Sequence, residues 1–337
     1  MESPFFETIL PTLGFDDETE RVARDLNRDG FAVFRFDDAA LEQRAERIKA
    51  HLGGLFDAVG WRRDEWPLGV GRRYFDFWRH DADVAAIAAN QTVIRLLGDL
   101  YGRSAFPFQT LNFPVGSQQH YHSDAVHFSS VPERFMCGVW LALEDVHEDA
   151  GPLVYYPGSH RWPIVYNDQI GVRIAGTTTS RDQTMYEPYW RAMVETSGAR
   201  PRHFLPKKGE ALIWSANLLH GGAPQRDPTR TRWSQVTHYF FADCCYTTPM
   251  LSDTAIGRPF VREMVDIASG RHVPNVYVDV PLSDVERLAA DPAPPPDFDA
   301  DRYLALNPDV AAAVARRATT AIDHYRLHGV KEGRRYR

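Results

Sequence analysis

The chain has 337 residues, of which 44% are hydrophobic and 25% charged, and its formal net charge is −7 at pH 7. This length suits one large domain with a smaller one, and the composition is ordinary for a globular protein. The acidic balance argues against nucleic acid or an anionic membrane surface as a partner, because both favour a basic face. No apolar run reaches the length of about 18 residues or more that crossing a membrane requires.

The cysteines and the N-terminal segment are the features that indicate a cellular compartment. Cys137, Cys244 and Cys245 have no C-x-x-C spacing and cannot form a disulfide framework. The N-terminal segment lacks the basic n-region and the long apolar core of a signal peptide. We therefore expect a reduced, cytoplasmic setting.

The N-terminal third is predicted to be mainly helical. Acidic residues at 16–20 open a helix at the end where the helix dipole favours negative charge. An alternating strand follows at 31–36 and a second helix at about 38–51. A third helix is predicted at roughly 84–101, broken or restarted near 90–91.

Residues 60–80 interleave aromatic side chains with arginines. One interpretation is a segment that covers the substrate and offers it stacking surfaces and cations. The other is a surface stretch whose rings pack on the core while the arginine heads reach solvent. Under the first interpretation, Trp78 and Arg73 are candidate substrate contacts. The arginines of this segment are Arg62, Arg63, Arg72, Arg73 and Arg79.

Short strand-like segments separated by proline and glycine turns fill the middle of the chain. They lie at residues 106–113, 118–123, 134–144, 153–156, 202–205, 210–215 and 232–241, with an inserted helix predicted at 182–197. Many short strands, with helices gathered near the N-terminus, predict a mainly β fold with flanking helices (α+β), a jelly-roll-like sandwich.

The composition changes near the C-terminus. Residues 289–297 form a proline-rich, semi-rigid linker, and residues 298–337 predict a small helical module. The predicted layout is thus a main domain at 1–288, with its core at about 15–250, followed by the linker and the module. Because the module is too small to bury much core alone, we expect it to dock on the main domain or on another subunit.

Two histidines and an aspartate have the character of metal ligands. His122 and Asp124 are two residues apart, so on an extended segment both side chains leave the same face. His220, at the end of an apolar strand and before a Gly-Gly pair, is the best third ligand. Two imidazoles and one carboxylate leave three metal positions open, which suits Fe(II) oxygenases that bind a co-substrate and O2. Zinc would prefer a closed tetrahedral set, or three ligands with one water.

A buried cation should accompany such a site. If 2-oxoglutarate chelates the iron through its keto oxygen and C1 carboxylate, its distal carboxylate needs a positive partner. A guanidinium fits best because it stays charged and binds carboxylates in a bidentate fork. Arg232 is the favoured anchor, and Arg230 is the close rival because residues i and i+2 of a strand share a face.

Four motifs in order carry a family resemblance. H-x-D at 122–124, P-G-S-H at 157–160, H-G at 220–221 and an arginine about a dozen residues later at R-W-S resemble the phytanoyl-CoA dioxygenase family of Fe(II)/2-oxoglutarate oxygenases. The resemblance covers roughly residues 15–250.

This resemblance implies a double-stranded β-helix, a cupin-like jelly roll. It also implies iron on His122, Asp124 and His220 and the 2-oxoglutarate carboxylate on Arg232. Residues 109–112 resemble the strand that lends polar side chains to the co-substrate pocket, which makes Gln109 and Asn112 candidate cofactor contacts. The spacing from His220 to Arg232 is about one residue longer than is common in the family, so Arg230 remains an alternative anchor for 2-oxoglutarate.

The C-terminal tail resembles a short unit appended to assorted bacterial enzymes, some associated with glycan assembly. That likeness does not settle its role.

Other histidines have alternative interpretations. His120 shares a face with His122 but is predicted not to bind metal, whereas His127 either lines the substrate pocket or is structural. His238 is interpreted mainly as packing. The P-G-S-H turn is read as structural, because a Ser159–His160 hydrolytic pair would lack a nucleophile elbow and an orienting acid.

The expected activity is hydroxylation of a C–H bond with Fe(II), 2-oxoglutarate and O2, releasing succinate and CO2. The expected substrate is a small molecule, natural-product or glycan-related, whose identity the sequence does not indicate. A non-catalytic binding or assembly module on the same fold, and a zinc hydrolase using the same ligands, are the alternatives.

Overall fold

The computed structural model describes residues 3–58, 73–172, 183–278, 280–282, 295, 297–315, 320–329 and 332–336. The chain divides by its internal contacts into two compact units, Met1–Asp279 and Val280–Arg337. No helix within the described ranges is long and apolar enough to cross a membrane.

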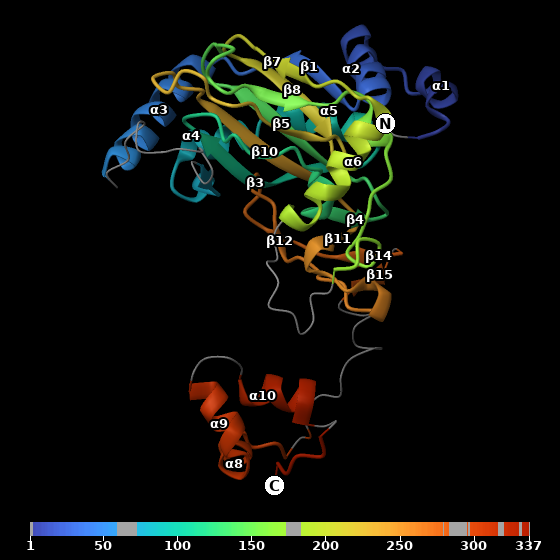
Figure 1. The fold of residues 1–337 in the computed structure, drawn as a ribbon, viewed down its shortest axis with the longest axis vertical. Helices are drawn as coiled ribbons and strands as arrows, with labels where there is room; N and C mark the ends of the chain where they lie inside the picture. The colour runs from blue at the N-terminus through green and yellow to red at the C-terminus, as the bar shows by residue number, and fades with distance from the viewer. Residues whose placement is uncertain are drawn as a thin grey trace. The chain divides into compact units, whose positions relative to one another are not determined.

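A six-stranded antiparallel sheet forms the centre of the first unit (Figure 1). Its strands, in spatial order, are β1 (Phe31–Arg35), β8 (Glu210–Ser215), β5 (Met136–Ala142), β10 (Ser234–Phe241), β3 (Ala105–Phe113) and β2 (Tyr74–Phe75). Strand β10 pairs with both β5 and β3, and its register with β3 shifts between His238 and Tyr239. Side chains alternate between the two faces of each strand, so this sheet has two distinct buried surfaces.

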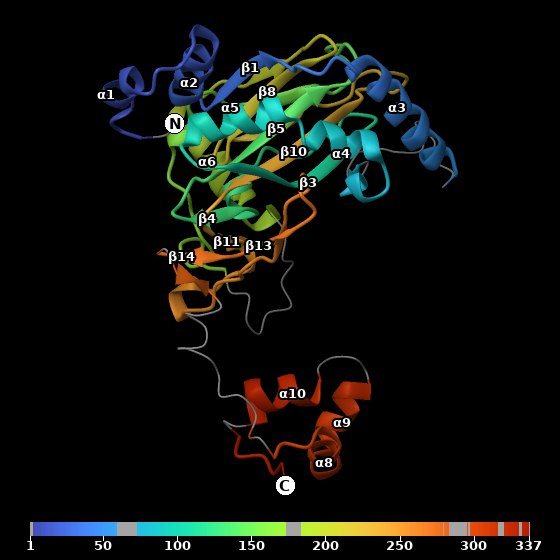
Figure 2. The same cartoon turned by 180° about the vertical axis from the view of Figure 1, so that it is seen from behind.

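Helices cover one face of the sheet (Figure 2). They are α2 (Asp17–Asp29), α3 (Leu41–Ala58), α4 (Ala82–Ala88) and α5 (Gln91–Tyr101). The Asp16 carboxylate accepts the Thr19 N–H at 2.7 Å and starts α2, and Gly30, with φ of 83°, ends it. The predicted break near residues 90–91 is confirmed, because α4 and α5 are separate helices.

A smaller antiparallel sheet packs against the opposite face. It contains β7 (Arg202–Phe204), β6 (Leu153–Tyr155) and β9 (His220–Gly222). Apolar side chains of both sheets, among them Trp140 and Phe204, form a common cluster between them. The observed architecture is therefore a mixture of helices and antiparallel sheets, with two sheets enclosing an interior.

The segment at 118–123 differs from expectation. It was predicted to be a strand, but it forms only an isolated bridge, between His122 and His220. The inserted helix is shorter than predicted and runs over α6 (Glu187–Ser197). The first unit also contains these short elements: α1 (Phe6–Ile9), β4 (Ser129–Val131), β11 (Cys245–Thr247), β12 (Met264–Val265), β13 (His272–Val273) and β14 (Val276–Tyr277).

The second unit contains three short helices with a small apolar cluster of their own. They are α8 (Ala300–Leu306), α9 (Pro308–Ala315) and α10 (Ala321–His324), and a single π-helical turn follows α10. Asp299 starts α8 by accepting the Arg302 N–H at 3.0 Å. Tyr303 and Val310 are almost completely buried in the cluster.

Candidate active site

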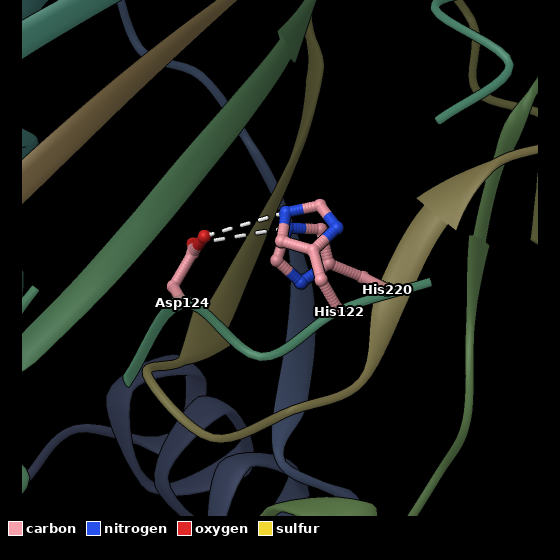
Figure 3. Close-up of side chains that lie close together, drawn as sticks. All are labelled: His122, Asp124 and His220. Atoms are coloured by element: carbon pink, nitrogen blue, oxygen red, sulfur yellow. Dashed lines mark ion pairs between the residues drawn. The ribbon is translucent and has the colours of Figure 1, made fainter. Parts of the chain in front are cut away.

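Three side chains converge between the two sheets (Figure 3). Their potential ligand atoms, one on each of His122, Asp124 and His220, lie within 4.8 Å of one another. Asp124 Oδ1 is 3.6 Å from His122 Nε2, and Asp124 Oδ2 is 3.7 Å from His220 Nε2. All three side chains are buried, so a single ion could be held in their midst.

Backbone pairing fixes this geometry. The His122 N–H donates to the His220 carbonyl at 2.8 Å, and the His220 N–H donates back at 3.0 Å. A Cβ atom on Gly221 would lie 2.7 Å from the Gln119 carbonyl oxygen. The glycine after His220 is therefore needed for the two segments to approach closely, and the approach brings the two imidazoles together.

The P-G-S-H turn supports the same strand. The Ser159 hydroxyl accepts the Leu219 N–H at 2.9 Å and donates to the Tyr156 carbonyl at 2.7 Å. Gly158 has φ of 82°, a left-handed conformation that favours glycine. The turn is structural, as the sequence predicted, and it positions the residue next to His220.

Both imidazoles present the same nitrogen to the site. His122 Nδ1 lies 3.0 Å from the His120 carbonyl, and His220 Nδ1 lies 3.0 Å from the Leu218 carbonyl. A carbonyl oxygen only accepts, so each Nδ1 carries the hydrogen and each Nε2 is left with its lone pair. Burial lowers the pKa of His220 to about 4, so its ring is neutral near pH 7, the state in which imidazole binds metals.

Asp124 is held as an ionised carboxylate. Burial opposes its ionisation, but the imidazoles around it outweigh burial and keep its pKa well below the usual range. Trp214 Nε1–H donates to Asp124 Oδ2 at 2.8 Å, and His238 Nε2 lies 3.5 Å from the same oxygen. Gln109 Oε1 in turn lies 3.0 Å from His238 Nδ1. Trp214 and His238, which are both buried, thus orient the Asp124 carboxylate.

Arg232 enters the same pocket from the segment just before β10. It is 2% exposed, and its guanidinium carbon lies 5.5 Å from the ring centroids of both Phe113 and Trp140. Its Nε has no hydrogen-bond partner, and no ion pair is found for it among the residues that the structure describes. Burial lowers its pKa to about 10, so the guanidinium is still charged near pH 7. The charge of Glu144 opposes this shift only in part, and Glu144 forms no ion pair with Arg232 in the described structure, so the buried cation points to an anionic ligand.

Arg230 lies in a different environment. Its side chain is 43% exposed and forms an ion pair with Asp227 at 3.1 Å. Of the two arginines, only Arg232 lines the pocket with His122, Asp124 and His220.

The other predicted site residues separate into two groups. Arg73 also lines the pocket, and His127 lies beside it, with its ring centroid 5.9 Å from that of His122. Asn112 instead faces the helices, where its Nδ2 donates to Gln235 Oε1 at 3.2 Å. Trp78 packs against the helix-side core.

Part of the arginine-rich segment cannot be placed. Arg62, Arg63 and Arg72 lie outside the described residues.

His238 and Trp214 were missed as site residues. His238 does pack against Phe128, at 5.0 Å between ring centroids, but it also lines the pocket beside Asp124. A signal was present in the sequence, because His238 is an even number of residues from Arg232 and strand side chains alternate with a period of two. No comparable signal pointed to Trp214, which reaches Asp124 from β8.

The donor set fits a mononuclear iron site. Two neutral imidazoles and a carboxylate on one side of an ion are the ligands typical of Fe(II) enzymes that use a co-substrate and O2. The nearby unpaired guanidinium fits a co-substrate with a second carboxylate.

Comparisons with known proteins identify the family. The family model for phytanoyl-CoA dioxygenase (PhyH) matches residues 26–232. The ectoine dioxygenase of Nocardia farcinica (strain IFM 10152) is 24% identical over 247 residues, which cover 67% of this chain and 79% of that protein. The peroxisomal phytanoyl-CoA dioxygenase of Rattus norvegicus is 23% identical over 157 residues, 46% of this chain and 42% of that protein.

Solved structures share the fold. EctD from S. alaskensis, crystallised with 2-oxoglutarate and 5-hydroxyectoine, superposes with a TM-score of 0.51 at 18% identity, covering 70% of this chain and 79% of that one. The non-haem α-ketoglutarate-dependent carbocyclase SnoK from nogalamycin biosynthesis gives a TM-score of 0.52 at 14% identity, covering 69% and 87%. Because the family model matches more than half of this chain, the chain belongs to the phytanoyl-CoA dioxygenase (PhyH) family.

Proposed function

We propose that this protein is an Fe(II)- and 2-oxoglutarate-dependent dioxygenase that oxidises a C–H bond of a small-molecule substrate. The observation that carries the proposal is the joint presence, in one pocket, of the His122, Asp124 and His220 cluster and the unpaired guanidinium of Arg232. The fold supports it, since two antiparallel sheets with helical flanks are consistent with a double-stranded β-helix.

Each residue has a distinct role. His122 and His220 would bind the iron through Nε2, and Asp124 through its carboxylate. With iron and 2-oxoglutarate bound, the site would supply oxidative decarboxylation of the co-substrate to succinate and CO2, coupled to substrate oxidation. Arg232 would bind the distal carboxylate of 2-oxoglutarate and so orient the co-substrate, and the aromatic rings of Phe113 and Trp140 exclude water around that ion pair.

The alternatives explain less of the pocket. A binding module has no need for a buried cluster of His122, Asp124 and His220 with oriented imidazoles, which supports the enzyme instead. A zinc hydrolase has no need for a buried, unpaired guanidinium beside the metal.

We also propose that residues 298–337 form a helical module, separated from the main domain by the proline-rich segment at 289–297. The small apolar cluster around Tyr303 and Val310 supports a unit that holds itself together. The second compact unit itself begins earlier, at Val280.

The decisive experiment is succinate formation by the purified protein with Fe(II), 2-oxoglutarate and O2. Anaerobic addition of Fe(II) and 2-oxoglutarate should also produce a visible charge-transfer band. Asp124→Ala should abolish both signals, because it removes the carboxylate from the cluster. Full activity in that variant, or activity that requires zinc instead of iron, would refute the proposal.

A further inference from the structure

A second arginine lies at the edge of the pocket. Arg73 lines it together with Arg232 and the three candidate ligands, but unlike Arg232 it is partly exposed. Its Nη1 donates to Gln119 Oε1 at 2.7 Å, whereas its buried Nε has no partner within the described part of the chain. Burial lowers its pKa, and the negative charge of Asp124 only partly opposes that shift.

Arg73 is one end of a chain of polar side chains, which we call the polar arch: Arg73, Gln119, Gln183 and His127. Gln119 Nε2 donates to Gln183 Oε1 at 2.8 Å, and His127 Nε2 lies 3.3 Å from the same oxygen. The arch joins segments far apart in the sequence and ends beside the His122 ring. Such a connected network holds its members in fixed positions.

Arg73 supplies the charge of the arch. Gln119 and Gln183 are neutral amides. The amide partner of Arg73 does not neutralise its guanidinium.

The formal charges of the pocket with iron and 2-oxoglutarate bound leave one positive charge unbalanced. Asp124 is the carboxylate among the described lining residues, and it faces the candidate metal position. A divalent iron, the Asp124 carboxylate, a doubly negative 2-oxoglutarate and Arg232 together balance to zero. The positive charge of Arg73 then remains without a counter-charge in the described pocket. A partly desolvated cation is stabilised by an anionic partner.

We propose that Arg73 binds an oxyanion of the organic substrate, such as a carboxylate, so that the enzyme selects anionic small molecules. This inference rests on the proposed function of the same pocket. Arg232, fully buried and close to two aromatic rings, is suited to the co-substrate, whereas Arg73 is half-buried and lines the same pocket, so it is free to bind a second anion. The hydrogen bond from Nη1 to Gln119 holds the guanidinium of Arg73 in a fixed orientation at the pocket.

The test uses the full chain loaded with Mn(II) and N-oxalylglycine. This unreactive analogue of 2-oxoglutarate would pair its distal carboxylate with Arg232. The probe is trifluoroacetate, and trifluoroacetamide is its neutral counterpart. Paramagnetic broadening of the 19F signal reports binding near the metal. We expect broadening of trifluoroacetate but not of trifluoroacetamide, and about tenfold or more weaker trifluoroacetate binding in Arg73→Gln, the loss typical of a hydrogen bond to a charged group.

Three further variants serve as controls for this test. Arg73→Lys should retain most of the anion binding because it keeps the charge, and Arg79→Gln, at an exposed arginine stacked on Trp78, should behave like the wild type. Arg73→Met serves as the second neutral variant if Arg73→Gln fails to fold.

The two proposals fail in different ways. Equal broadening by trifluoroacetate in the wild type and the neutral variants, no broadening at all, or equal broadening by the amide would overturn the assignment of Arg73. Failure of the wild-type protein to bind Mn(II) or N-oxalylglycine would instead overturn the dioxygenase proposal, and the Arg73 inference with it.

Discussion

The two faces of the larger sheet both bury polar side chains, but they use them differently. On the pocket face, Arg232 and His238 are 2% and 3% exposed, and on the helix face Gln235 is fully buried. Gln235 donates to the Val84 carbonyl at 3.0 Å and accepts from Asn112. Tyr239, also on the helix face, donates to the Ala88 carbonyl at 2.9 Å.

This contrast shows that burial alone does not identify a functional residue. Gln235 and Tyr239 of the helix face are neutral, and backbone carbonyls of the packed helices accept their hydrogen bonds. Groups of the pocket face are ionisable, and the Arg232 guanidinium has a donor without a partner in the described structure. A buried charge without a counter-charge is the better indicator of a ligand site.

The largest effect should come from Arg232. Arg232→Gln should raise the KM for 2-oxoglutarate about 30-fold or more, because it replaces a charge-assisted pair worth about 2 kcal/mol or more. The measurement is the rate of succinate formation against 2-oxoglutarate concentration. Arg230→Gln is the matched control and should change KM less than about twofold, because that arginine is exposed and paired with Asp227. The reverse pattern would make Arg230 the anchor.

A smaller effect is expected behind the metal ligands. His238→Gln should weaken Fe(II) binding about tenfold, the lower end of the usual loss on removing a group that orients a ligand. Chelator competition measures this affinity without turnover. Tyr239→Phe, the next residue but on the helix face, should leave the Fe(II) affinity unchanged. Unchanged affinity in His238→Gln would reduce His238 to the packing role predicted from the sequence.

His160, a buried histidine outside the pocket, should affect the free energy of unfolding. Burial lowers the pKa of His160 to about 4, below its ordinary value of about 6.5. Between these values the unfolded chain binds a proton that the folded chain does not, so the free energy of unfolding falls as pH falls. From pH 7 to pH 5 this residue should remove about 2 kcal/mol, measured by urea unfolding.

The control for His160 is a variant that does not titrate. In His160→Gln the loss between pH 7 and pH 5 should be smaller by the same amount. Identical pH profiles for the two proteins would contradict the expected titration of His160.

The smallest catalytic effect is expected on the helix face. Asn112→Ala should leave the KM for 2-oxoglutarate within about twofold of the wild type, because Asn112 points away from the pocket. The variant should lose about 1 kcal/mol of stability, since it removes the hydrogen bond to buried Gln235. A large rise in KM with normal stability would restore Asn112 as a co-substrate contact.

The sequence by itself was sufficient to select His122, Asp124 and His220 as candidate metal ligands and to predict antiparallel sheets with flanking helices. H-x-D places two ligands on one side of a short segment, and His220 is marked by the strand end and the glycine that follows it. The helices at the N-terminus were also predictable, because their caps and apolar spacing are local features.

Tertiary structure alone decided the surroundings of that cluster. Arg230 and Arg232 both precede β10, and the choice between them depends on which side chain the packing buries, which spacing does not reveal. Gln109 and Asn112 are three residues apart on one strand and face opposite sides, a difference that strand alternation allowed but that needed the register. Trp214 and Gln183 reach the site from distant segments, because side-chain contacts across sheets depend on how the layers pack and not on sequence spacing.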